Sequence, residues 1–224
     1  MSATRHVSLR KGQQTRVAIV NAALEQASRA GLEGLTIGAL AEQKHMSKSG
    51  VFAHFGSRED LQIAVLKAYE ERFIDEILKP SLREARGLPR LLAILNHWLD
   101  RTVIEAALGC IWISGASEYD DRPGAVREEL VSMVRGWQRE VSRAIEQCIQ
   151  EGHLRQDADV NDLVFGIYGV ILVLHHDSRL MRSAEALPRA RRAIDRLLQQ
   201  YVAVPLSAAA ATLRTITLQP SQAA

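Results

Sequence analysis

The sequence predicts an all-α protein. Apolar residues recur at three- and four-residue steps in most segments, as they do along one face of a helix. The 224 residues include only 14 Gly and 6 Pro, too few for most turn-rich β architectures, and no stretch alternates apolar and polar residues as a strand would. With 47% hydrophobic and 24% charged residues, the composition also excludes wholesale disorder.

Three short helices are predicted between residues 15 and 56. Their apolar faces are formed, in chain order, by Val20, Ala23, Leu24 and Ala27, by Ile37, Leu40 and Ala41, and by Val51 and Phe55. Gly31 and Gly56 end the first and third helices, and Thr36 and Ser47 are N-caps of the second and third. The tight turn between the last two has the spacing of a helix-turn-helix, although a generic helical bundle has the same spacing.

The remaining helices follow from the same signals. Ser57 caps a fourth helix that extends to Leu78, before Pro80, with acidic residues in its first turn. Further helices are expected over residues 87–99, 126–148, 159–174 and 187–201, with a short apolar stretch at 109–119 and a turn at 119–124. Asp159 is the predicted N-cap of the helix at 159–174. The predicted domains are a basic arm (1–14), a helix-turn-helix domain (15–60), a C-terminal domain (61–204) and an Ala-, Ser- and Thr-rich tail (205–224).

The charge is distributed unevenly along the chain. Residues 1–60 contain eight Lys and Arg against five Asp and Glu, whereas residues 61–224 contain 20 against 21. An excess of positive charge at one end is a mild indication of a nucleic-acid contact there, and chance in an Arg-rich surface is the alternative. The two cysteines cannot form a disulfide framework, which favours a reducing, cytoplasmic setting.

Several function classes find no support in the sequence. The longest apolar run, residues 163–174, is well short of the ~20 residues of a membrane span, and no secretory signal is present. No hydrolase, P-loop, dinucleotide or zinc-protease motif occurs, so neither catalysis nor a cofactor is expected. His175 and His176 are adjacent on a predicted helix and would point about 100° apart, so no metal site is expected either.

The stretch Met46–Leu66, MSKSGVFAHFGSREDLQIAVL, carries the most specific signal. In order and spacing it resembles the DNA-binding domain of the tetracycline-repressor (TetR) family of transcriptional regulators, and the resemblance extends over Thr15–Phe73. The chain departs from the family pattern at four positions: Phe52 replaces Tyr, Arg58 replaces Lys, His45 stands where the turn commonly has Gly, and Ala27 replaces a large aromatic. A left-handed backbone at His45 would be strained.

The resemblance implies a recognition helix that begins at Ser47 and enters the major groove. Short or polar side chains at its N-terminal end can reach base edges, and helix N-termini and cations can bind phosphate. The predicted DNA-binding residues are Thr36, Ser47, Lys48, Ser49, Gly50, Phe52, His54 and Arg58. Val51, Phe55, Leu40 and Ile37 are interpreted as core.

The resemblance also implies a C-terminal bundle that binds a small molecule and forms a dimer. The predicted pocket is lined by His97, Trp98, Cys110, Trp112, Trp137, Phe165 and Tyr168, with ordinary packed core as the alternative for each. The dimer contact is predicted on the helices at 159–174 and 187–201, through Val170, Leu174, Ile194, Leu197 and Leu198.

The sequence therefore favours a homodimeric repressor that binds a near-palindromic, double-stranded DNA operator and is released by a small-molecule inducer. An activator fits the same residues. The competing hypothesis is a helical ligand-binding or scaffold protein that does not use DNA, which would show neither sequence preference nor a steep loss of DNA affinity with salt.

Overall fold

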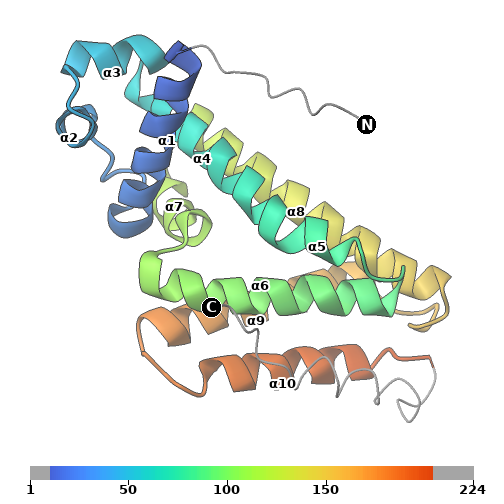
Figure 1. The fold of residues 1–224 in the computed structure, drawn as a ribbon. Helices are drawn as coiled ribbons and strands as arrows, with labels where there is room; N and C mark the ends of the chain where they lie inside the picture. Colours follow the sequence, from blue (N-terminus) through green and yellow to red (C-terminus); the bar gives the residue numbers. More distant parts are fainter. Residues whose placement is uncertain (1–10, 204–224) are drawn as a thin grey trace, which may run out of the picture. The chain divides into compact units, whose positions relative to one another are not determined.

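The computed structural model describes residues 11–203, and Figure 1 shows its ribbon. The elements, in chain order, are α1 (Lys11–Ala30), α2 (Ile37–Gln43), α3 (Lys48–Phe55), α4 (Arg58–Phe73), η1 (Ile74–Leu78), α5 (Lys79–Ser81), α6 (Leu88–Leu108), α7 (Ile111–Tyr119), α8 (Ala125–Gln150), α9 (Val160–Arg179) and α10 (Ala186–Gln199). Apart from one antiparallel bridge between Leu154 and Val202, residues 11–203 contain no β-structure. The predicted all-α class is confirmed.

Four predicted helix caps are confirmed. The side chains of Thr36, Ser47 and Ser57 accept hydrogen bonds from backbone N–H groups in the first turns of α2, α3 and α4. Asp159 does the same for two amides of α9. Each cap satisfies donors that the helix itself leaves without a partner, and this fixes where the short helices begin.

The helices differ from the predictions in length. The first begins at Lys11, inside the predicted arm, and α6 continues to Leu108 rather than ending near residue 99. The predicted fourth helix divides into α4 and a π-helical segment, η1, and the chain then passes through Pro80 in the short α5. A proline ring clashes with the carbonyl four residues earlier in a regular α-helix, and a wider turn takes up that mismatch. Residues 1–10 and the predicted tail at 205–224 lie outside the described residues.

The chain divides into two compact units, and the division falls within α5, α6 and α8. The first unit contains residues up to 79 together with 101–137, and the second contains 80–100 and the chain from 138 onward. The predicted helix-turn-helix domain at 15–60 is thus one part of a larger unit that also includes α4, η1, α7 and portions of α6 and α8.

In the first unit, α1 packs against α4, and α2 and α3 pack against each other and against these two helices. The fully buried side chains here include Ile19, Leu32, Leu35, Leu40, Val51, Leu61, Val65 and Leu66. Ile37, predicted as core, is only half-buried. In the second unit, α9 and α10 pack side by side and α6 lies against both, through Trp98 on Tyr168 and Arg191 on Asn96 and Asp100.

Gly109, between α6 and α7, allows a close backbone approach in the first unit. Its φ of +113° is a conformation that side chains disfavour, and an added Cβ would overlap the carbonyl oxygen of Ser28 near the end of α1. Gly152 also has a positive φ, of +72°, but a Cβ there would meet no other atom.

Replacing Gly109 and Gly152 by alanine separates two contributions to stability: the cost of a side chain at positive φ and the cost of overlap with α1. Gly152→Ala is expected to lower the free energy of unfolding by about 1 kcal/mol, the cost of the left-handed backbone alone. Gly109→Ala should lower it by about 3 kcal/mol or more, because α1 must also move. Equal losses for the two variants in urea unfolding would contradict the close contact between Gly109 and α1.

Candidate nucleic-acid interface

The turn between α2 and α3 forms a helix-turn-helix in which each helix is anchored by its own cap. The hydroxyl of Ser47 accepts a hydrogen bond from the amide of Gly50 at 3.0 Å and lies 3.1 Å from the hydroxyl of Ser49. In the turn, the amide of Met46 donates to the carbonyl of Ala41 at 2.8 Å. These bonds hold the two helices close together and leave the start of α3 exposed.

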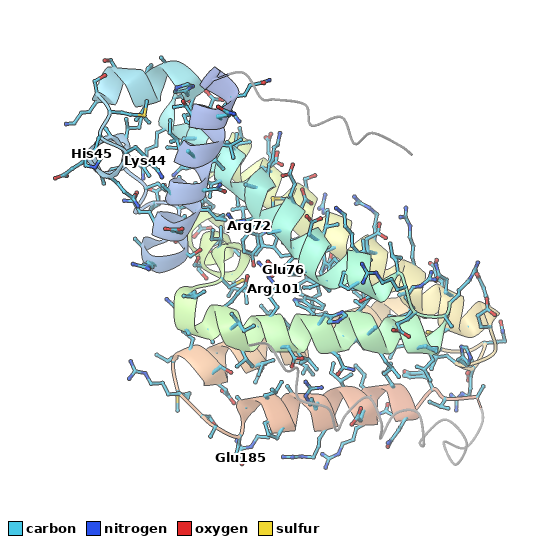
Figure 2. All side chains as sticks on the ribbon, viewed as in Figure 1. Lys44, His45, Arg72, Glu76, Arg101 and Glu185 are labelled. Atoms are coloured by element: carbon cyan, nitrogen blue, oxygen red, sulfur yellow. The ribbon has the colours of Figure 1, made fainter. Side chains whose placement is uncertain are left out.

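His45 occupies the turn with a φ of +52°, in the left-handed region. This is the strained geometry expected from a non-glycine residue at this position, with a cost of order 1 kcal/mol. His45 and Lys44 lie together at the end of α2, as Figure 2 shows. The His45 side chain is exposed in the turn directly before α3, the helix that is predicted to read DNA.

The exposed surface of α3 includes its first two residues and Phe52 near its middle. Lys48 and Ser49 are exposed, and Phe52 is 49% exposed. Val51 and Phe55 are buried and hold the helix against the rest of the unit, as predicted. This arrangement presents small, polar and cationic groups on one side of α3, which is what major-groove contact requires.

The side chains of Lys48, His54 and Arg16 make contacts within the unit at or beside this surface. The side chain of Lys48 folds back over Gly38 in α2, where its Cε lies 3.3 Å from the position that a Cβ would take. The ammonium therefore lies beside the N-terminal end of α2, which Thr36 caps. His54, expected to face outward, is half-buried with its ring centroid 6.4 Å from that of Phe55. The guanidinium of Arg16 lies 4.9 Å from the ring centroid of Phe55.

The side chain of Arg58, which is predicted to contact phosphate, forms hydrogen bonds and an ion pair within the protein. Its guanidinium donates to the carbonyls of Leu35 at 3.1 Å and Glu33 at 2.5 Å, and it lies 3.4 Å from the Glu33 carboxylate. The physical reason is that the loop between α1 and α2 exposes unpaired carbonyls directly beside the start of α4. Arg58 thus positions the helix-turn-helix through that loop.

Glu33 is the centre of a set of contacts that sequence reasoning missed. Its carboxylate accepts from the Tyr119 hydroxyl and lies 3.1 Å from the Arg122 guanidinium, and its amide donates to Glu118 at 2.8 Å. The Tyr119 hydrogen bond, together with Arg58 and Arg122, lowers the pKa of Glu33, whereas burial and the same bond raise the pKa of Tyr119. No sequence signal pairs Glu33 with Glu118 or Tyr119, since they are 85 and 86 positions apart.

Comparison with known proteins assigns both parts of the chain. Residues 19–65 match the family described as "Bacterial regulatory proteins, tetR family", and residues 87–194 match "Tetracyclin repressor-like, C-terminal domain". Together the matches cover more than half of the 224 residues. The chain belongs to the TetR family. It is therefore a ligand-responsive, DNA-binding transcriptional regulator and not an enzyme.

Solved structures share the fold of this TetR-family chain. A TetR transcriptional regulator from Chloroflexus aurantiacus is 23% identical, with a TM-score of 0.76 over 88% of this chain and 100% of its own. A TetR-family regulator from Cytophaga hutchinsonii is 18% identical, with a TM-score of 0.74 over 88% and 99%. FadR from Bacillus subtilis, in complex with stearoyl-CoA, is 16% identical, with a TM-score of 0.64 over 81% and 97%. A search of curated protein sequences finds no match.

The residues predicted to line a ligand pocket in this TetR-family regulator fall into two groups. Cys110, Trp112 and Trp137 belong to the first unit, where the ring of Phe73 lies 4.3 Å from that of Trp112 and 4.8 Å from that of Trp137. His97, Trp98 and Tyr168 belong to the second unit. There, the ring centroids of Trp98 and Tyr168 lie 5.1 Å apart, and His97 Nδ1 lies 3.0 Å from the Ser81 hydroxyl.

Phe165 also belongs to the second unit but does not face its interior, which corrects the prediction that it lines the bundle interior. Its side chain is 82% exposed on α9. The apolar run at 163–174 contains residues for two faces of the helix, and periodicity does not decide which of them faces inward. The buried face of α9 consists of Leu163, Val164, Ile167, Ile171, Leu174 and His175.

The predicted dimer residues need a similar correction. Leu174, Ile194 and Leu198 are buried within their own chain, so they are not available to a partner surface. Val170 and Leu197 are half-buried. The exposed apolar residues of α9 are instead Phe165, Leu172 and Val173.

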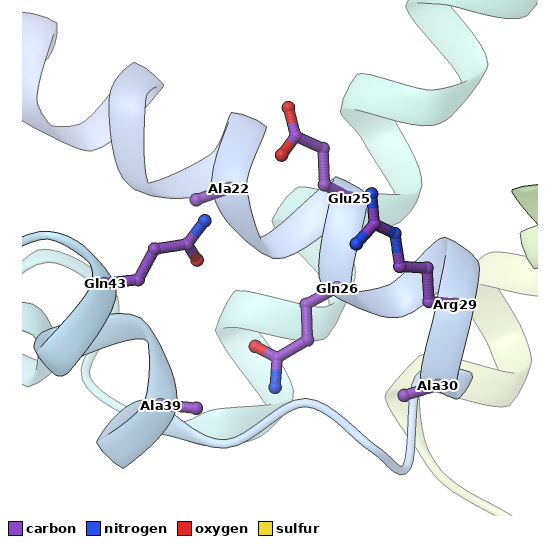
Figure 3. Close-up of a pocket in the computed structure, with 7 residues that line it drawn as sticks. All are labelled: Ala22, Glu25, Gln26, Arg29, Ala30, Ala39 and Gln43. Atoms are coloured by element: carbon purple, nitrogen blue, oxygen red, sulfur yellow. The ribbon is translucent and has the colours of Figure 1, made fainter.

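An open groove of about 310 Å³ lies between α1 and α2 (Figure 3). It is lined by Ala22, Glu25, Gln26, Arg29, Ala30, Ala39 and Gln43, and includes none of the predicted pocket residues. Gln26 donates a hydrogen bond to the carbonyl of Gly34, in the loop between α1 and α2, at 3.3 Å. No helix within residues 11–203 is long and apolar enough to cross a membrane.

Lys48 gives the interface a direct test. Lys48→Ala should weaken binding to all DNA sequences about equally and reduce the slope of log affinity against log salt by about one, the effect of a lost phosphate contact. Lys67→Ala is the matched control. Lys67 is also an exposed lysine, but it is on α4, outside the helix-turn-helix, and its Nζ lies 4.0 Å from the carboxylate of Glu129 on α8. The interface would be misplaced if both variants bound DNA like the wild type in fluorescence anisotropy at two salt concentrations.

Proposed function

We propose that the protein is a repressor that binds a near-palindromic DNA operator as a homodimer and leaves it when a small molecule binds. The observation that carries the proposal is the helix-turn-helix with an exposed, polar start of α3 in a chain of the TetR family. A dimer presents two such helices, and each reads half of the site. As a regulator of bacterial DNA, it would act in the cytoplasm.

Three features support DNA binding by this surface. The cap residues of α2 and α3, Thr36 and Ser47, are exposed, Lys48 adds a cation beside the start of α2, and residues 1–60 carry the positive excess of the chain. Ser47 and Ser49 are short enough to reach base edges. Gly50, in contrast, permits close approach but adds no hydrogen bond.

Selection from random duplex DNA tests this proposal. The expected product is a site with twofold symmetry whose half-sites lie about 34–36 Å apart, or a multiple of that distance, with affinity that falls steeply with salt. Binding without sequence preference or salt dependence would instead support the DNA-independent scaffold. Increased transcription from a promoter that carries the selected site would identify an activator and contradict the repressor assignment.

The proposed dimer surface is the exposed face of α9. Phe165, Gly169, Leu172 and Val173 follow one another at steps of three, four or one residue and lie on one side of the helix. A Cβ at Gly169 would meet no atom of its own chain, so the backbone there is open to close approach by another helix. The buried residues Leu174, Ile194 and Leu198 support this face from behind by packing α9 against α10.

Phe165→Glu should convert the dimer into monomers, because it places a charge in the centre of an apolar contact. Operator affinity should fall with it, since a monomer reads only one half-site. Leu82→Glu is the control, because Leu82 is an exposed leucine outside α9 and α10. Light scattering after size-exclusion chromatography measures the mass, and a Phe165→Glu protein that retains the dimer mass would move the interface elsewhere.

The ligand response is supported by structures with the same fold. The solved FadR structure contains stearoyl-CoA, and another neighbour is the ketosteroid transcriptional regulator KstR2 of Mycobacterium tuberculosis. In this chain, the aromatic group around Trp112 and the pair formed by Trp98 and Tyr168 are the two proposed places for a small molecule. A ligand releases DNA only if it binds one arrangement of the protein better than the other.

A further inference from the structure

Three aromatic rings form a cage inside the first unit. The rings of Tyr69 and Phe73 from α4 and Trp112 from α7 lie against one another, with centroids 4.3 to 6.2 Å apart. All three side chains are buried. Aromatic faces carry negative partial charge, so a cage of this kind attracts cations.

The cage already contains a cation of its own. The guanidinium of Arg101, from α6, lies 5.2 Å from the ring centroid of Tyr69 and 5.3 Å from that of Phe73. Its side chain is only 12% exposed. Figure 2 shows Arg101 beside Glu76, the residue of η1 with which it forms an ion pair.

The guanidinium of Arg101 forms ion pairs with two carboxylates, one buried and one exposed. Glu105, which is buried, accepts from Arg101 Nε at 2.9 Å and from the Tyr69 hydroxyl at 2.6 Å. Glu76 pairs with the opposite side of the guanidinium, and its side chain is 59% exposed. The formal charge of the cluster is therefore negative even with the arginine in place.

The other polar groups of the cluster are neutral. Burial raises the pKa of Tyr69 and raises that of Cys110 to about 12, and the Cys110 sulfur lies 3.4 Å from the Tyr69 hydroxyl. The indole Nε1 of Trp112 is buried without a hydrogen-bond partner.

We propose that this cage is a binding site for an organic cation, an amidinium, guanidinium or alkylammonium group on an apolar body, and that Arg101 is a built-in occupant which the ligand displaces. The proposal rests on the ligand-responsive function given above and names the ligand class. Nothing in the mechanism of DNA binding requires a cation at this place.

The two carboxylates provide a route for the exchange. When Arg101 moves outward it remains paired with the exposed Glu76, and the incoming cation takes its place on Glu105, so no buried charge loses its partner. An anionic ligand would have to take Arg101 from Glu105 and leave a buried carboxylate alone, which is strongly unfavourable. Glu76 lies in the π-helical η1, a type of segment that often occurs at functional sites.

The wild-type cage is tested with benzamidinium and benzamide, which share a ring and differ in charge. Measurements use Trp98→Phe protein, because Trp98 lies in the other unit and its emission would dilute the signal from the cage. Benzamidinium is expected to change tryptophan emission with an affinity at least tenfold above that of benzamide, and Glu105→Gln should abolish the difference. Equal binding of the two compounds, or no loss of preference in Glu105→Gln, would overturn the proposal.

Removal of the occupant gives a second, independent test. Arg101→Ala deletes the part of the side chain that N-ethylguanidinium reproduces, and N-ethylurea is its neutral analogue. N-ethylguanidinium should raise the thermal midpoint of Arg101→Ala by several degrees, or restore folding if the variant is unfolded, and N-ethylurea should not. The matched control is Arg90→Ala, whose arginine bonds Glu84 and Gln147 in the second unit and should show no response.

The outcomes separate this site from the function on which it rests. Lack of rescue by N-ethylguanidinium, or equal rescue of Arg101→Ala and Arg90→Ala, would overturn the cage while leaving operator binding intact. Selective binding of benzamidinium by a protein that selects no operator would refute the proposed function and leave the cation site standing. If both hold, benzamidinium should lower operator affinity, and operator DNA must weaken benzamidinium binding by the same factor.

Discussion

The carboxylate and backbone of Glu33 connect three parts of the first unit that lie far apart in sequence. Arg58 brings the start of α4 to this residue, and Glu118 and Tyr119 bring the end of α7. The loop that carries Glu33 leads directly into the capped start of α2. The orientation of the helix-turn-helix within the unit therefore depends on contacts made by α4 and α7, neither of which is predicted to touch DNA bases.

The same two helices form the aromatic cage at a distance from the loop. α4 contributes Arg58 at its first residue and Phe73 at its last, and α7 contributes Trp112 near its start and Tyr119 at its end. A rigid helix transmits a shift at one end to the other, and Gly109 holds the start of α7 close to α1. A ligand that exchanges with Arg101 would thus act on both helices that position the DNA-reading surface, provided that it prefers one arrangement of them.

The sequence predicted what is determined locally and missed what is determined by packing. The caps at Thr36 and Ser47 were readable because a side chain bonds to a backbone amide three residues away. The contact between Arg58 and Glu33 could not be read from the sequence, because the two residues are 25 positions apart and no pattern links them. Phe165 was placed inside because a helix that is apolar on every face gives no indication of which face is covered.

The cluster around Arg101 is hard to explain as a device for stability. A buried ion pair seldom contributes more than well-packed apolar residues of the same volume, because both charges must leave water. Here one guanidinium is held between a buried and an exposed carboxylate, against the aromatic rings of the cage. What the charged arrangement adds, under the proposed exchange, is a second state in which the guanidinium moves out along Glu76 and another cation enters. A group that can leave without stranding a buried charge gives a ligand-controlled regulator two accessible arrangements, and these are the minimum that a switch requires.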